Sequence, residues 1–247
     1  MKQFLLIIPV YNGVTYIDQT VSELVRFFNT NPQYFDILWV DDGSLDGTKQ
    51  EIQRCTKKTG LSMDILSYSD NKGKGGAIAY ALKQVQNRGY HVIGFTDVEL
   101  PYGIGAVDRQ FQHLRDHKNT DIVVGTRLAC SVGLPQYHWY RRLTRKVFRL
   151  CVPSIISTIS DTQCGVKAFR ASVMQDIFSR LQTHRWVFDI EVFVIARLLG
   201  FCVYEIPVNI KPTCIERRGG VSFFRHGFSL VKDILCVYYS MMTKRYE

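Results

Sequence analysis

The sequence lacks an apolar run long enough to cross a bilayer. Arg149, Pro153, Arg197 and Gly200 interrupt the richest apolar segments of the 247 residues, so none reaches the roughly 18 apolar residues typical of a membrane-spanning helix. Residues 1–10 carry one charge and no small-residue cleavage site, so we expect a strand there and no signal peptide. These absences predict a protein of the cytosol or of the cytosolic face of a membrane.

Paired cysteine motifs are also absent. The 7 cysteines are scattered and none belongs to a Cys-x-x-Cys pair, which argues against a disulfide framework and a zinc site, so we expect buried free thiols. His113 and His117 have the spacing of a helical metal pair, but Arg115 and Asp116 lie between them and no glutamate follows the first histidine. A solvated helix face is therefore the favoured interpretation.

Neither a linker, an internal repeat nor a low-complexity tract is present, so we expect one compact domain over residues 1–247. The chain is 46% hydrophobic and 21% charged, which excludes intrinsic disorder and collagen-like structure. Its formal charge of +9 raises the question of a nucleic-acid partner. No recognised nucleic-acid module occurs in the sequence, so we expect no such partner.

The order of elements predicts an α/β fold with a mostly parallel sheet flanked by helices, because β-rich runs alternate with segments of helical periodicity. We expect strands at 4–10, 36–40, 63–68, 91–95, 121–125 and 203–206, and helices at 15–29, 48–59, 76–88 and 188–199. Polar clusters follow the strands, where ligands bind in open α/β sheets. Residues 1–127 therefore resemble a nucleotide-binding half.

Two carboxylates follow the predicted strand at 91–95. Asp97 and Glu99 offer hard oxygen ligands of the kind that Mg²⁺ or Mn²⁺ uses to hold a diphosphate. An ordinary solvated turn is the alternative. Placement directly after an apolar strand favours the metal, because burying two carboxylates without a cation is costly.

A glycine-rich segment follows the predicted strand at 63–68. Residues 71–76, NKGKGG, match neither a dinucleotide fingerprint nor a P-loop. We expect these glycines to let backbone approach a ligand closely and the following helix N-terminus to favour phosphate. The alternative is a flexible turn with two solvated lysines.

Several motifs occur together in the order found in glycosyltransferase family 2. They are PVYN at 9–12, VDDGSLDGT at 40–48, NKGKGGA at 71–77 and TDVE at 96–99. The chain resembles the polyprenyl-phosphate sugar synthases of that family from about residue 3 to 236. Residues 125–127, 161–169 and 185–191 are most similar to dolichyl-phosphate β-glucosyltransferases and their bacterial relatives.

This resemblance implies a GT-A fold with a nucleotide-sugar half at 1–127, an acceptor half at 128–222 and an amphipathic C-terminal helix at 223–247. It implies a divalent cation, Mg²⁺ or Mn²⁺, on Asp97 and Glu99, although Glu99 stands where the family motif has aspartate. The nucleotide-sugar-binding residues that it implies are Pro9, Tyr11, Asn12, Asp41, Asp42, Lys74, Gly75 and Asp97.

The implied reaction inverts the anomeric carbon by direct displacement onto a lipid phosphate. Because such a phosphate is already anionic, cations that position it matter more than a strong base. The candidates are Arg127, Lys167, Arg217 and Arg218. For a hydroxyl acceptor, Asp189 or Glu191 would be the natural base; otherwise they cap the helix or orient Lys167 and Arg185. Trp186 and Phe188 either stack on the acceptor or belong to the core, with the core favoured for Phe188.

The sequence departs from its relatives in two places. Relatives read Arg-x-x-Gly-x-Ser-Lys where this chain has Phe223 in place of the lysine, and Arg218 is its candidate substitute. Many relatives also carry a transmembrane helix, and this chain shows none. We expect membrane contact through the basic, aromatic run 138–149, with 223–239 as a second apolar surface or a docking face for a separate anchor subunit. Ordinary amphipathic packing is the alternative for both segments.

These features predict a metal-dependent hexosyltransferase, peripheral on the cytoplasmic face of a membrane, that moves glucose from UDP-glucose to a polyprenyl phosphate. The preference for a UDP-linked donor depends only on the likeness of 161–169 to glucose-transferring relatives. Two alternatives remain: a family 2 enzyme acting on a glycan hydroxyl, and a non-catalytic nucleotide-sugar-binding relative.

Overall fold

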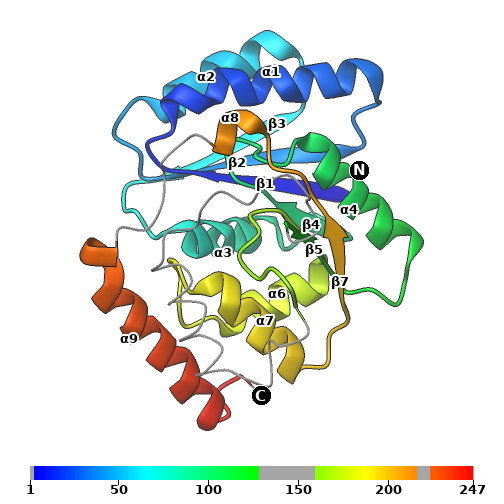
Figure 1. The fold of residues 1–247 in the computed structure, drawn as a ribbon. Coiled ribbons are helices and arrows are strands. Elements are labelled where there is room, and N and C mark those ends of the chain that lie inside the picture. Colours follow the sequence, from blue (N-terminus) through cyan, green and yellow to red (C-terminus); the bar gives the residue numbers. More distant parts are fainter. Residues whose placement is uncertain (1–2, 128–158, 216–222, 247) are drawn as a thin grey trace.

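A seven-stranded sheet runs through the part of the chain that the computed structural model describes, residues 3–127, 159–215 and 223–246 (Figure 1). The strands stand in the order β3-β2-β1-β4-β6-β5-β7. They are β1 (Phe4–Val10), β2 (Phe35–Asp42), β3 (Met63–Tyr68), β4 (Val92–Phe95), β5 (Ile122–Thr126), β6 (Lys167–Arg170) and β7 (Val203–Pro207). The helices are α1 (Val14–Thr30), α2 (Thr48–Thr59), α3 (Lys74–Val85), α4 (Ile104–Asp116), α6 (Ala171–Arg180), α7 (Phe188–Leu198), α8 (Pro212–Ile215) and α9 (Phe223–Met242).

Helices cover both faces of the sheet. Strands β3, β2, β1 and β4 pair in parallel, and every residue of β1 is buried, as expected of a parallel strand that is covered on both sides. In Figure 1, α1, α2 and α4 lie on one face, and α3, α6 and α7 lie on the other. The predicted mostly parallel α/β sheet is confirmed, with β1, α2 and β3 ending where the sequence predicts.

Strand β6 was missed by the sequence analysis. It has only four residues, too few to show a period, and it pairs antiparallel with both β4 and β5. The pairing sets Lys167 opposite Phe95 of β4 and Val124 of β5. The tract that begins at Asp161 is thereby brought to the carboxyl end of β4, where Asp97 lies. Helices α4 and α6 were also not predicted.

The exposure of the cysteines differs in part from the prediction. Cys55 and Cys164 are buried, whereas Cys202 is exposed on the turn before β7. The described cysteines are all free thiols. His113 and His117 lie at the end of α4 with ring centroids 4.1 Å apart. Burial and the neighbouring His117 lower the pKa of His113.

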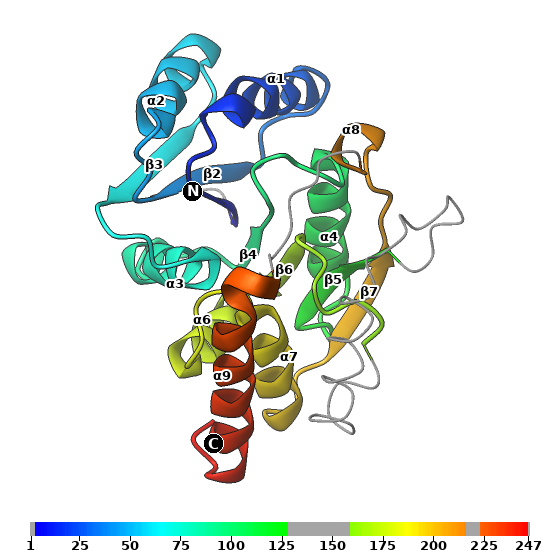
Figure 2. The same ribbon diagram turned by 60° about the vertical axis from the view of Figure 1, so that its left-hand side comes forward.

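Helix α9 packs beside α6 and α7 near the C-terminal end of the chain (Figure 2). Tyr246 follows it and is completely buried. No helix in the described part of the chain has the length and hydropathy needed to span a membrane.

Candidate active site

The loop after β1 is fastened to the loop after β2. Asn12 has a positive φ of 47°; its backbone N–H donates to Ser44 Oγ at 2.9 Å, and its Oδ1 accepts from the backbone N–H of Leu45 at 2.9 Å. Pro9 is buried within β1, while Tyr11 is about half exposed. Of the residues predicted here for the donor, Tyr11 and Asn12 are therefore exposed, and Asn12 holds the two loops together.

Asp42 organises the glycine-rich segment. Its carboxylate is buried and accepts hydrogen bonds from the Tyr68 hydroxyl at 2.7 Å, Asn71 Nδ2 at 2.9 Å, the Lys72 N–H at 2.7 Å and the Gly73 N–H at 2.9 Å. Burial and the bond to Asp42 raise the pKa of Tyr68. The aspartate therefore fixes the path of the segment that carries Lys74.

Asp41 holds the loop after β2 in a similar way. Its carboxylate is buried and accepts from the Ser44 N–H at 3.0 Å and from Ser67 Oγ at 3.1 Å. Both aspartates of the motif thus make several bonds within the chain. Buried carboxylates require such partners.

The glycines face protein, which corrects the prediction that they let a ligand approach. Gly75 and Gly76 donate their N–H groups to the carbonyl of His184, at 2.9 and 3.3 Å. A Cβ on Gly75 would lie 2.7 Å from Phe188 Cγ. These two N–H groups of the first turn of α3 are therefore taken, and the phosphate site predicted there would have to do without them.

Asp97 lies between a lysine and a glycine. Lys74 Nζ is 2.5 Å from Asp97 Oδ1, and both side chains keep partial exposure. A Cβ on Gly165 would lie only 1.8 Å from Asp97 Oδ2, so only glycine leaves room for the carboxylate. Burial lowers the pKa of Lys74, but Asp97 and Asp189 outweigh this effect and raise it above the ordinary value.

A second ion pair lies deeper. Lys167 Nζ is 2.5 Å from Asp189 Oδ1 and donates to the carbonyl of Cys164 at 2.8 Å. The Lys167 side chain is completely buried, with Phe95 and Phe193 around its ammonium. This corrects the expected phosphate contact of Lys167, because its ammonium has no exposed surface in this structure. It orients Asp189 instead.

Arg127 forms a fork with Asp161 at the end of β5. Its Nε and Nη2 donate to the two carboxylate oxygens at 2.5 and 2.6 Å. Burial raises the pKa of Asp161, but Arg127 outweighs it and holds that pKa below the ordinary value. Burial also raises the pKa of Tyr102. Cys164 and Asp97 raise this pKa further, and Arg127 acts to lower it. These side chains therefore share one electrostatic environment.

Glu191 is buried behind the site. It accepts from the Gln182 N–H at 2.7 Å, the Thr183 N–H at 2.8 Å, Thr183 Oγ1 at 2.6 Å and the Tyr246 hydroxyl at 2.7 Å. A general base needs access to the substrate, so the structural role is the one that this geometry supports. The sequence analysis missed Tyr246, and nothing local in the sequence marks it.

The remaining predicted residues differ in their surroundings. Phe188 is core, as favoured, whereas Trp186 is about half exposed. Arg185 donates to the side-chain Oδ1 and to the backbone carbonyl of Asn71, both at 3.2 Å. Glu99 is half-buried in the turn after β4. Arg217, Arg218 and the run 138–149 lie outside the described residues.

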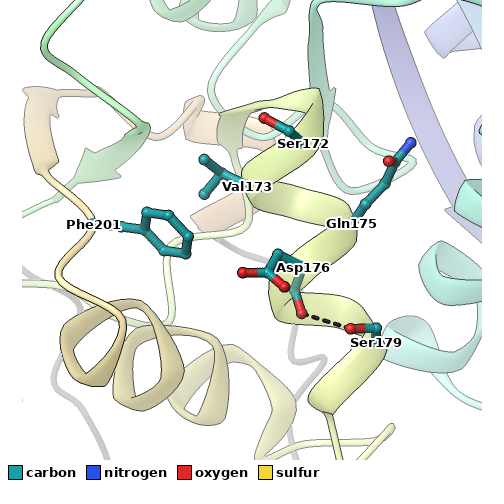
Figure 3. Close-up of a pocket in the computed structure, with 6 residues that line it drawn as sticks. All are labelled: Ser172, Val173, Gln175, Asp176, Ser179 and Phe201. Atoms are coloured by element: carbon teal, nitrogen blue, oxygen red, sulfur yellow. Dashed lines mark hydrogen bonds between the residues drawn. The ribbon is translucent and has the colours of Figure 1, made fainter. Parts of the chain in front are cut away.

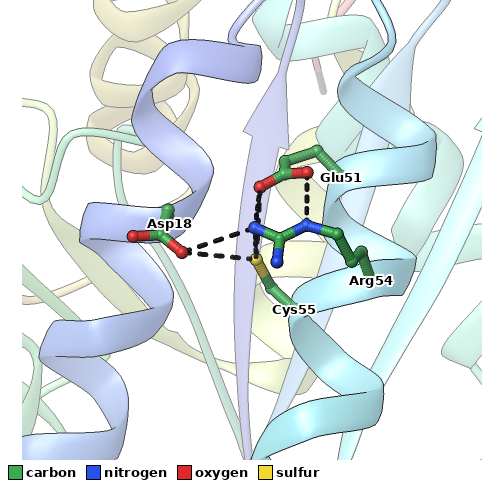
Figure 4. Close-up of polar contacts among 4 residues, drawn as sticks. All are labelled: Asp18, Glu51, Arg54 and Cys55. Carbon is green, nitrogen blue, oxygen red and sulfur yellow. Dashed lines mark hydrogen bonds and ion pairs between the residues drawn. The ribbon is translucent and has the colours of Figure 1, made fainter.

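Two other surface features are separate from this cluster. In the described ranges, the one group of three potential metal ligands is Asp18, Glu51 and Cys55, on α1 and α2. Arg54 lies among them and pairs with both carboxylates (Figure 4). Its guanidinium therefore already supplies the positive charge that a metal ion would bring to these side chains. A depression beside α6 is lined by Ser172, Val173, Gln175, Asp176, Ser179 and Phe201 (Figure 3). Neither feature contains a predicted site residue.

The chain is similar to known glycosyltransferases over most of its length. The family model described as glycosyl transferase family 2 matches residues 5–178. A dolichyl-phosphate beta-glucosyltransferase of Dictyostelium discoideum is 28% identical over 219 residues, which cover 82% of this chain and 64% of the relative. The human protein of the same name is 28% identical over 259 residues, covering 98% of this chain and 76% of the relative. The chain thus spans somewhat less than two thirds of the Dictyostelium protein.

Solved structures share the fold. Glucosyl-3-phosphoglycerate synthase from Mycobacterium tuberculosis, in complex with UDP, superposes with a TM-score of 0.66 at 12% identity, covering 96% of this chain and 80% of that one. Mannosyl-3-phosphoglycerate synthase from Rubrobacter xylanophilus gives a TM-score of 0.64 at 15% identity, with 94% and 72% covered. At this identity the likeness shows the fold alone, and it confirms the predicted GT-A fold. Because the family model spans well over half of the sequence, the chain belongs to glycosyl transferase family 2.

Proposed function

We propose that this chain is an inverting hexosyltransferase that moves glucose from UDP-glucose to a polyprenyl phosphate. Support comes from family membership and from the name dolichyl-phosphate beta-glucosyltransferase that its relatives carry. The observation that carries the proposal is the pairing of Lys74 with Asp97 and of Lys167 with Asp189 at the ends of β4 and β6. In this arrangement Lys74 supplies a partly exposed positive charge to position anionic groups, while the carboxylates described on α7 are occupied by partners within the chain.

The acceptor class follows from how the two carboxylates of α7 are used. Glu191 is buried with four hydrogen bonds, and Asp189 Oδ1 is held by Lys167. A hydroxyl acceptor needs a base to take its proton. A phosphate monoester is already anionic and needs positioning and charge screening instead. The geometry therefore supports a phosphate acceptor.

The donor would lie across the carboxyl ends of β1, β2 and β4, as ligands do in open α/β sheets. We assign contact with the base and ribose to Tyr11, beside the buried Pro9. Asp41, Asp42 and Asn12 position the surrounding loops through the bonds described above. Gly75 acts through packing. Lys74 is the cation nearest to Asp97 and would face the diphosphate.

A divalent cation fits the residues at the end of β4. The Asp97 carboxylate is half-buried and already holds one positive charge, the Lys74 ammonium, so the position favours cations; carboxylate oxygens suit Mg²⁺ and Mn²⁺. Asp97 and Glu99 would hold the ion. When bound, it would stabilise the negative charge that develops on the leaving diphosphate. Arg127, fixed by Asp161, would add positive charge on the acceptor side, together with Arg217 and Arg218.

The acceptor is a lipid, so we propose that the enzyme works at the cytoplasmic face of a membrane as a peripheral protein. The run 138–149 remains a predicted contact with the bilayer. A separate membrane-anchor subunit remains an alternative source of attachment.

A donor screen tests the proposal. Purified protein with Mn²⁺ and a short polyprenyl phosphate is incubated separately with radiolabelled UDP-glucose, UDP-N-acetylglucosamine and GDP-mannose, and label is followed into the organic phase. We expect label from UDP-glucose, and its loss in Asp97→Asn. No label from any donor, while calorimetry still detects nucleotide-sugar binding, would overturn the acceptor assignment. Equal label with Asp97→Asn would overturn the role of Asp97.

A further inference from the structure

Helix α9 has apolar side chains on two opposite faces. One face packs on the domain and includes the buried Ile234 and Val237. The other consists of Leu235, Tyr238, Tyr239 and Met242, which are between 43% and 65% exposed. Their spacing of three, four and seven residues places them on one side of the helix. We call these four residues the outer face of α9.

The end of α9 is firmly attached, so the outer face has a defined orientation. The Tyr246 hydroxyl donates to Glu191 of α7 at 2.7 Å, and Arg180 of α6 donates to the Tyr246 carbonyl at 2.9 Å. Tyr246 itself is completely buried. These contacts hold the inner face against α6 and α7 and leave the outer face in solvent.

Basic residues flank the outer face at both ends. Lys232 is exposed one turn before Leu235, and Lys244 and Arg245 are exposed just after Met242. The Arg245 guanidinium lies 5.3 Å from the centre of the Tyr239 ring. Between residues 232 and 246 the single acidic residue is Asp233, which lies within α9 and is half-buried. Exposed tyrosines and aliphatic residues bordered by cations are typical of helices that lie in a membrane interface.

The charge pattern also favours an anionic surface over a second copy of the chain. If two α9 helices paired through their outer faces, either orientation would set the cations of one end against cations of the partner helix. Anionic lipid headgroups instead complement both ends at once. The burial of four side chains is also small compared with a stable protein interface.

Helix α9 also carries a charge that interacts with Arg185. Burial raises the pKa of Asp233, while the charges of Lys232 and Arg185 act in the opposite direction. Arg185 in turn bonds Asn71 in the segment that Asp42 organises.

We propose that the outer face of α9 inserts, in the plane of the membrane, into the interface of an anionic bilayer from which the enzyme takes its lipid phosphate. The lipid acceptor belongs to the function proposed above, and the inference deepens that function by naming the surface that meets the lipid.

Vesicle sedimentation of the full chain tests this inference. The vesicles are pure phosphatidylcholine, or phosphatidylcholine with phosphatidylglycerol. A triple variant, Leu235→Gln with Tyr239→Gln and Met242→Gln, removes most of the outer face. Leu198→Gln on α7 is the matched control, because Leu198 is also an exposed apolar helix residue. We expect wild type and Leu198→Gln to bind the anionic vesicles. The partition coefficient of the triple variant should be lower by about tenfold or more.

A second measurement separates membrane binding from folding and catalysis. The triple variant should keep the wild-type unfolding midpoint and the wild-type rate with a short, water-soluble polyprenyl phosphate in the absence of vesicles. The inference is overturned if wild type does not bind anionic vesicles, or if the triple variant binds them as strongly as wild type does. A wild-type dimer in light scattering that the triple variant dissociates also overturns it, in favour of a second copy. The vesicles can give the expected pattern while no donor gives transfer. That combination supports membrane binding by the outer face and counts against the proposed function alone.

Discussion

A single methyl group behind Asp97 should uncouple folding from catalysis. The Gly165 backbone touches the Asp97 carboxylate, and a Cβ built there would lie 1.8 Å from Oδ2 and 2.8 Å from Cγ. Ordinary van der Waals contact needs well over 3 Å. In Gly165→Ala the carboxylate must therefore move by more than about 1 Å, away from the place where it meets Lys74.

The size of the effect follows from this displacement. A misplacement of about 1 Å at a reacting centre costs on the order of a hundredfold in rate, so we expect that loss in kcat/KM for glucose transfer. Overpacking one methyl group costs about 1–3 kcal/mol in stability, and the half-exposed Asp97 side chain can turn toward solvent, so the lower end of that range applies. Binding of Mn²⁺ together with UDP should weaken in parallel.

Calorimetry of Mn²⁺ and UDP binding, transfer kinetics and urea unfolding would be measured on the same preparation. Gly105→Ala is the matched control, since a Cβ on Gly105 would meet only Arg109 Nη1, at 4.0 Å; it should leave binding and transfer unchanged and should not lower stability, because alanine favours the helix more than glycine does. Wild-type affinity and rate in Gly165→Ala would refute the reasoning, because Asp97 would then act from some other position. Loss of all signals together with loss of folding would show that the methyl group disrupts more than the carboxylate.

Three further predictions concern the scaffold of the site. Gly75→Ala forces a methyl group against the aromatic ring at the start of α7 and should cost about 1–3 kcal/mol in urea unfolding; an unchanged midpoint would contradict the packing. Tyr246→Phe removes a hydrogen bond to Glu191 and should cost about 1.5–3 kcal/mol, measured by circular dichroism, whereas a neutral result would show that the bond contributes nothing net. Because Arg127 outweighs burial and holds the pKa of Asp161 below 3.8, their pair stabilises the fold fully above that value. This stability is lost as the pH falls through the folded pKa. Asp161→Asn should therefore flatten the acid limb of stability against pH, and an unchanged limb would exclude the pair as its source.

The elements with strong local signals were predictable from the sequence. Strand β1 is a continuous apolar run, and α2 begins where Asp46 accepts hydrogen bonds from the N–H and hydroxyl of Thr48. The positions of the strand ends followed from the alternation of elements, so Asp42, Asp97 and Arg127 were expected at one edge of the sheet. Such signals are local, and the physics that creates them is readable along the chain.

The contacts between distant segments were not predictable in the same way. The sequence shows that glycines permit close approach, but not that His184 and Phe188 are what approaches. Likewise, a four-residue antiparallel strand carries no period, and Tyr246 has no motif. What fixed these features is tertiary packing, which a local pattern does not encode.

The two lysine–aspartate pairs of the site differ in how readily a ligand can open them. Lys167 is completely buried and Asp189 keeps 15% of its side-chain surface exposed, and breaking a pair with a buried member leaves an uncompensated charge at a cost of about 3–5 kcal/mol. Lys74 and Asp97 keep 24% and 35% of their side-chain surface exposed, and pairs at that exposure contribute about 1 kcal/mol or less. Under the proposed function, a cation that binds with a diphosphate would therefore displace Lys74 from Asp97 at little cost, and the Lys74 ammonium would then be free to face the phosphates. Asp189, by contrast, would keep its bond to Lys167, so we expect it to support the site as a fixed charge and the exchange of partners to be confined to Asp97.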